Sequence, residues 1–151
     1  AVLWFTGGAV KKLVIDLADA GNTTGYIETG RLIVGDYWSP DYNADYGLQL
    51  GYMDASEHTR NEAGDLMTDI RPRSKSLSFG LRDATPADRK KLMRILRGNG
   101  MPGPIFISVF PGDADQDKEQ DYQLYGKLSQ LSALTLARFE SYTSSITIDE
   151  I

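Results

Sequence analysis

The stretch RSKSLSFGLRDATPADRKKLMRILRGNG, residues 73–100, decides the fold, because it places a strand pattern directly before a helix pattern. In its first part, Leu77, Phe79 and Leu81 alternate with serine and glycine. Alternation of this kind has the period of a strand with one buried face. The sequence therefore predicts a strand over residues 73–81.

The second part of the same stretch has the signals of a helix. Thr85 is a good N-cap, Pro86 suits the first helical position, and Asp88 places negative charge in the first turn. Apolar residues then recur at helical spacing, and glycine at position 98 or 100 ends the pattern. We predict one helix here.

Shorter patterns on both sides complete the expected elements. Strand-like runs occupy residues 11–17, 30–34, 47–53, 104–110, 122–131 (with a kink at Gly126) and 141–151, while residues 132–138 fit a helix or a strand. One helix that links strands argues against a doubly wound parallel sheet. The fold class expected is mainly β with one α-helix (α+β), an antiparallel β-sandwich or small barrel with a single helix packed on it.

The order of these patterns also suggests how the chain is organised. Residues 1–29 are hard to assign and form a candidate assembly arm, and residues 30–151 are expected to form a single β-sandwich-like domain. Two polar stretches separate strands: residues 54–69, expected as a long exposed loop, and residues 113–121, expected as an acidic loop.

Composition narrows the classes of function. The formal net charge is −5 and the sequence pI is about 4.8, which argues against a nucleic-acid-binding role. Cysteine is absent, so there is no thiol nucleophile and no thiolate zinc site. No apolar run approaches the length needed to span a bilayer. We expect a protein that is made, and used or assembled, in a cytoplasm.

No pattern of catalytic residues stands out. His58 is the only histidine, it lies in a polar stretch, and no Gly-x-Ser-x-Gly motif occurs. Asp113, Asp115 and Asp117 alternate like the start of a calcium loop, but Lys118 stands where that loop needs glycine. A solvated acidic turn is the better interpretation. We therefore predict no enzyme, no cofactor and no metal site.

Aromatic and basic residues offer the best candidates for binding. The aromatics between residues 37 and 46 could pack under their own loop, form a subunit interface or stack on sugars. With two N-terminal aromatics they make up the candidate interface: Trp4, Phe5, Tyr37, Trp38, Tyr42 and Tyr46. The helix adds five basic residues, which favour a solvated face or pairing with acidic loops of a neighbouring subunit over nucleic-acid contact: Arg89, Lys90, Lys91, Arg94 and Arg97.

Three segments resemble the minor tail and baseplate (distal-tail-like) proteins of long-tailed bacteriophages. They are GRLIVG at residues 30–35 with WSP at 38–40 and YGL at 46–48; RPR at 71–73 running through the strand into TPADR at 85–89; and the strand at 104–111 with the closing IDEI at 148–151. The resemblance runs from Gly30 onward and carries no residue with a fixed chemical role. It implies a β-sandwich subunit arranged in a ring, a trimer or hexamer.

The expected function is thus a structural component of a bacteriophage virion tail, at the tail tip, baseplate or connector. Its partners would be other phage tail proteins and further copies of itself, with no nucleic acid and no membrane span, and its location the virion, assembled in the host cytoplasm. The alternative is a carbohydrate-binding or receptor-binding module that uses the aromatic loop.

Overall fold

The computed structural model describes residues 2–4, 11–18 and 20–151. The chain separates into two compact units, Ala1–Trp38 and Ser39–Ile151. The expected domain boundary stood before Gly30, whereas residues 30–38 fall within the first unit.

The first unit has neither helix nor strand among its described residues. The strands expected at residues 11–17 and 30–34 are therefore wrong. Their apolar side chains are exposed, for example Val14 at 65% and Leu32 at 63%. Such residues favour a strand only where a neighbouring strand pairs with the backbone and one face is buried, and neither condition is met here.

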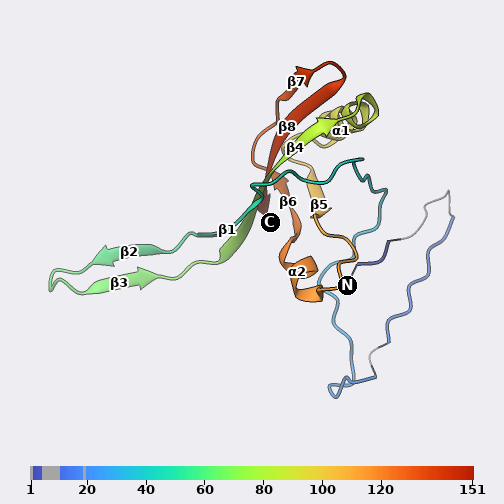
Figure 1. Cartoon of the computed structure of the whole chain (residues 1–151). Helices are drawn as coiled ribbons and strands as arrows, with labels where there is room; N and C mark the ends of the chain where they lie inside the picture. Colours follow the sequence, from blue (N-terminus) through green and yellow to red (C-terminus); the bar gives the residue numbers. More distant parts are fainter. Residues whose placement is uncertain (1, 5–10, 19) are drawn as a thin grey trace. The chain divides into compact units, whose positions relative to one another are not determined.

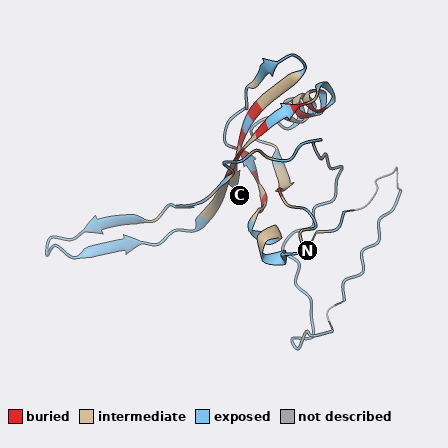
Figure 2. Ribbon diagram, in the orientation of Figure 1, coloured by how far each residue is buried: buried red, intermediate tan, exposed pale blue. Residues whose placement is uncertain are grey.

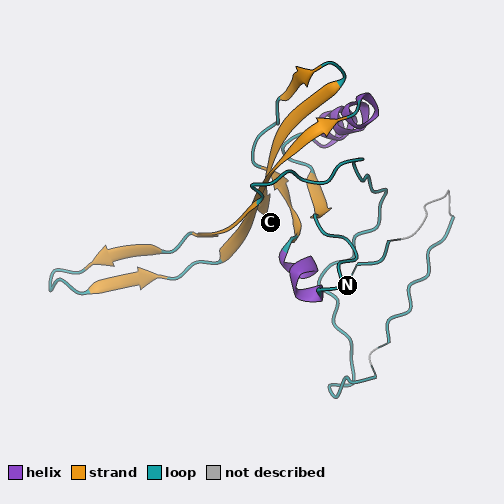
Figure 3. Cartoon of the chain, in the orientation of Figure 1, coloured by secondary structure: helices purple, strands orange, loops and turns teal. Residues whose placement is uncertain are grey.

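The second unit is built on an antiparallel six-stranded sheet (Figure 3). Its strand order is β1-β4-β8-β6-β5, and β7 also pairs with β8. The ladder places β4 along one side of β8, with β7 beside the first half of β8 and β6 beside its last residues. The strands are β1 (Gln49–Asp54), β4 (Arg73–Ala84), β5 (Pro104–Ser108), β6 (Gln123–Leu128), β7 (Leu134–Arg138) and β8 (Ser141–Glu150).

The mainly β, α+β fold class is confirmed. Helix α1 (Pro86–Asn99) packs on β4 and β8, so a helix layer and a sheet layer form the sandwich. The sheet ends at β1 and β5 without closing, so the barrel alternative is wrong. A second, short helix, α2 (Gln116–Asp121), lies in the segment expected as an acidic loop. In the described part of the chain, no helix has the length and apolarity that crossing a membrane requires.

The core lies between the sheet and α1. Leu77 and Ile148 face each other across β4 and β8, and each is only 1% exposed. Leu92 and Leu96 of α1 are buried as well. Figure 2 shows the buried positions gathered on β4, β8, β6 and α1. The alternation in β4 and the stripe on α1 therefore bury the residues that the sequence indicated.

Thr85 and Asp88 form a capping box at the start of α1. The Thr85 hydroxyl accepts a hydrogen bond from the Asp88 N–H at 3.2 Å, and the Asp88 carboxylate lies 2.8 Å from the same hydroxyl. This cap satisfies backbone donors that the helix itself leaves unpaired.

Replacing Thr85 with alanine should lower the free energy of unfolding by about 1 kcal/mol, because an N-cap hydrogen bond is lost. Urea denaturation measures the change. Thr85→Ser, which keeps the hydroxyl, is the matched control and should be close to the wild-type chain. Equal losses in both variants would contradict this role of the hydroxyl.

Candidate functional site

Strands β2 (Glu57–Arg60) and β3 (Leu66–Asp69) form a separate antiparallel hairpin. It continues the β1–β4 pair and projects away from the six-stranded sheet (Figure 1). We call residues 55–72 the hairpin arm. The loop expected at residues 54–69 is therefore wrong, since most of this stretch is paired strand.

The hairpin arm has no hydrophobic core. Every residue from 57 to 73 is exposed, as the uniform colour of the arm in Figure 2 shows. Its apolar side chains are exposed too: Leu66 at 57%, Met67 at 59% and Ile70 at 85%. Because these side chains are exposed, the arm gains little stability from apolar packing within the chain. A two-stranded hairpin alone is at best marginally stable in water.

Polar side-chain contacts accompany the backbone pairing of the two strands of the arm. The Arg71 N–H donates to the Ser56 hydroxyl at 3.0 Å, where the arm joins the sheet. The Arg71 guanidinium lies 3.1 Å from the carboxylates of both Glu57 and Asp69. These groups are exposed, and exposed ion pairs contribute little to stability.

The turn of the arm is fixed by asparagine and glycine. The Asn61 side-chain oxygen accepts from the Asp65 N–H at 2.8 Å, and Arg60 donates to the Gly64 carbonyl at 2.8 Å. Gly64 has φ +88°, a conformation that favours glycine. The arm therefore ends in a defined turn.

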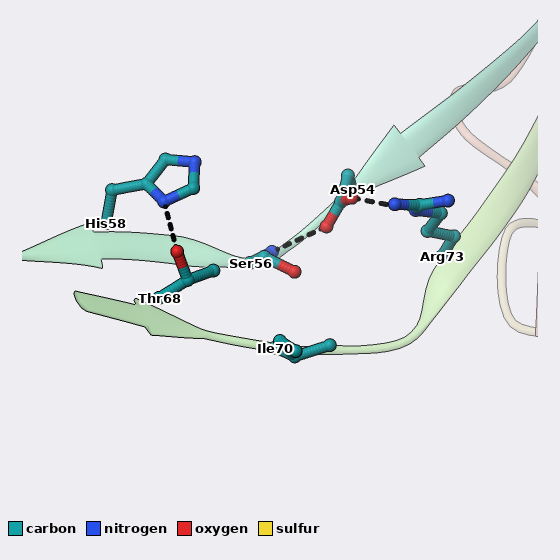
Figure 4. A pocket seen from close by; sticks show the side chains of 6 residues that line it. All are labelled: Asp54, Ser56, His58, Thr68, Ile70 and Arg73. Carbon is teal, nitrogen blue, oxygen red and sulfur yellow. Dashed lines mark hydrogen bonds and ion pairs between the residues drawn. The ribbon is translucent and has the colours of Figure 1, made fainter. Parts of the chain in front are cut away.

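A shallow depression of about 530 Å³ lies at the base of the arm (Figure 4). Within it, Asp54 accepts from the Ser56 N–H at 2.9 Å and from the Arg73 guanidinium at 2.8 Å. These contacts, those from Ser56 first, lower the pKa of Asp54 well below its usual range. His58 instead lies 2.9 Å from the Thr68 hydroxyl. The two side chains thus have different partners and share no hydrogen bond.

The predicted interface aromatics are divided between the two units. In the first unit, the rings of Trp4 and Tyr37 meet edge to face, with their centroids 5.1 Å apart, and Trp38 is half-buried. Phe5 lies outside the described residues. In the second unit, Tyr42 and Tyr46 are exposed at 61% and 103%. These two rings are accessible to a protein partner or a sugar.

Two of the three alternating aspartates, Asp113 and Asp115, are engaged in local structure. Asp113 lies 2.6 Å from the Lys118 ammonium, which holds the pKa of Asp113 below its usual value. Asp115 caps α2 by accepting from the N–H groups of Asp117 and Lys118, each at 3.2 Å. Over the part of the chain that the structure describes, no group of three or more His, Asp or Glu side chains is placed to hold a metal ion.

The apolar residues of the arm were not among the predicted interface residues. Two signals pointed to them: Leu66, Met67 and Ile70 interrupt a polar stretch, and Asn61 and Gly64 before them mark a turn. The polarity of the flanking residues instead suggested a loop. Turn residues flanked by short, weakly alternating runs are the pattern that would have identified the hairpin.

Comparisons with protein-family models, curated proteins and solved structures find nothing that matches this chain. The resemblance to phage tail proteins therefore stays a prediction.

Proposed function

We propose that this chain is a structural subunit of a bacteriophage virion tail, which acts by assembling with further copies of itself and with other tail proteins. The observation that carries the proposal is the hairpin arm: a defined hairpin whose residues 57–73 are all exposed and whose apolar side chains have no core. An arm of this kind is suited to reach across a neighbouring subunit, where Leu66, Met67 and Ile70 would be buried.

The energetics support contact through the arm. Exposed apolar groups of this size gain about 25 cal/mol for each Å² that a partner covers. The arm also presents free strand edges, which proteins normally cover, shorten or charge to avoid unwanted pairing. The phage assignment rests on the sequence resemblance, whereas the assembly role rests on the arm.

The test is a variant whose arm is replaced by a two-residue turn. Asp54 and Arg73 face each other in the β1–β4 register, so an Asn-Gly turn can join them in place of residues 55–72. We expect the wild-type chain to form a discrete oligomer by light scattering and a ring by electron microscopy. We expect the variant to lose this oligomer, because it lacks the apolar surface that contacts the neighbour.

Two controls make the result specific. The replaced residues contribute no buried side chain, so the thermal unfolding midpoint of the second unit should change little. Leu131→Ser with Leu136→Ser removes exposed apolar groups outside the arm and should leave the oligomer intact.

A variant without the arm that keeps the wild-type mass would contradict the assembly role. Antibodies against the chain that fail to label phage tails would contradict the virion assignment.

A further inference from the structure

The exposed face of α1 carries an unneutralised set of cations. The fifth basic side chain of the helix, Arg89, is held against the sheet, with its guanidinium 5.2 Å from the centre of the Tyr142 ring. The other four extend from the exposed side, and among the described residues none of them forms a salt bridge. We call these four the basic helix face: Lys90, Lys91, Arg94 and Arg97.

The segment from Asp113 to Asp121 carries the opposite charge. Its one cation, Lys118, is occupied by Asp113 at 2.6 Å. Four further carboxylates remain, and within the described chain none of them has a salt-bridge partner. We call these four the acidic segment: Asp115, Asp117, Glu119 and Asp121.

The two charged surfaces lie at opposite ends of the second unit. Strand β5 begins just after α1 and runs away from it toward α2, and Figure 1 shows α1 beside β4 and β8, and α2 next to the far end of β5 and the start of β6. The basic helix face and the acidic segment of one chain therefore do not neutralise each other. A neighbouring molecule can supply the missing partner for each.

We propose that the basic helix face of one copy docks on the acidic segment of the next copy, head to tail. Over the residues that the structure describes, four cations without a salt-bridge partner stand against four carboxylates without one, although Asp115 and Glu119 also accept backbone N–H groups. The whole chain is acidic, with a net charge of −5, so the basic helix face is the surface that attracts a second copy. A head-to-tail contact repeats from copy to copy and produces a ring when its rotation closes. This inference rests on the proposed function, since it names a second contact used in the same assembly.

The experiment reverses each surface separately in the full chain. The basic variant carries Lys90→Glu, Lys91→Glu and Arg94→Glu, all at exposed positions. The acidic variant carries Asp117→Lys and Asp121→Lys, which spares the α2 cap at Asp115 and the Glu119 carboxylate that accepts from the Gly112 N–H. Self-association is followed by sedimentation velocity at about 50 mM salt, where surface charges are weakly screened.

Each variant alone should associate at least about tenfold more weakly than the wild-type chain, and an equimolar mixture of the two should regain association. Rescue in the mixture is the decisive result, because neither general destabilisation nor altered net charge produces it. Lys127→Glu with Arg138→Glu reverses exposed cations elsewhere and should have little effect. If the basic variant fails to fold, glutamine at the same three positions tests the same loss of charge.

Three results would overturn the head-to-tail contact. In the first, both reversed variants associate as strongly as the wild-type chain. In the second, the two variants are folded but their mixture stays dissociated. In the third, the wild-type chain itself is monomeric. If the basic variant instead loses binding to a DNA duplex of about 20 base pairs while self-association is unchanged, the face is a polyanion site and the contact is again overturned. The variant without the arm keeps both charged surfaces, so it tests the proposed function separately.

Discussion

Replacing Leu77 with alanine is expected to lower the free energy of unfolding of the second unit by about 3 kcal/mol. Leu77 is 1% exposed and faces Ile148, also 1% exposed, across the pair of strands at the centre of the sheet. Alanine leaves a cavity that the surrounding strands cannot fill, because both strands are fixed by pairing on either side. Single domains are stable by only about 5–15 kcal/mol, so the loss is a large fraction of the total.

Urea denaturation followed by circular dichroism measures this change. Leu136→Ala in β7 is the matched control, because Leu136 is 61% exposed and its truncation should cost less than about 0.5 kcal/mol. Similar losses in the two variants would show that the centre of the core has been wrongly identified. Combining Leu77→Ala with Ile148→Ala should cost less than the sum of the single changes, since one cavity serves both.

Replacing Gly126 with alanine is expected to destabilise the sheet by about 3 kcal/mol or more, because there is no room for a side chain. A Cβ at this position would overlap the Asp149 carbonyl group and would lie 2.9 Å from the Ile148 methyl group Cγ2. The obstructing carbonyl belongs to backbone that pairs with both β4 and β6, so it cannot move without breaking ladder hydrogen bonds.

Gly51→Ala is the matched control for this prediction. Gly51 also lies in a strand of the sheet, but no atom lies within 4 Å of the position that its Cβ would occupy, and its φ is not positive. Its replacement should change stability by less than about 0.5 kcal/mol. Hydrogen exchange should show β6 losing protection in Gly126→Ala first. A Gly126→Ala chain as stable as the control would contradict the close approach of β6 and β8.

Gly126 also shows where sequence patterns mislead. Its place inside the strand predicted over residues 122–131 suggested a kink, yet β6 pairs in unbroken register with β5 through Ile105 and with β8 through Glu150. The glycine serves close packing of backbone against backbone. The lack of room for a side chain at Gly126 comes from the backbone of β8, which is distant in sequence. The residues next to Gly126 therefore do not reveal it.

The hairpin arm and the first unit show two opposite failures of prediction from local sequence patterns. Residues 57–60 and 66–69 pair although they lie in a mostly polar stretch, whereas residues 11–17 and 30–34 stay unpaired although their composition suits a strand. The aromatic interface candidates were visible in the sequence. That the basic helix face and the acidic segment have no salt-bridge partner among the described residues became evident only from the structure.

The sequence by itself determined the strand from Arg73, the helix after Thr85 and the mainly β class. Each of these follows from local causes: the alternation of Leu77, Phe79 and Leu81, and the cap formed by Thr85 and Asp88. Only the tertiary structure decided the strand order, the open sheet, the projection of the arm and the separation of the two charged surfaces. The reason is physical: strand pairing joins residues far apart in the chain, and its free energy depends on the partner as much as on the strand itself.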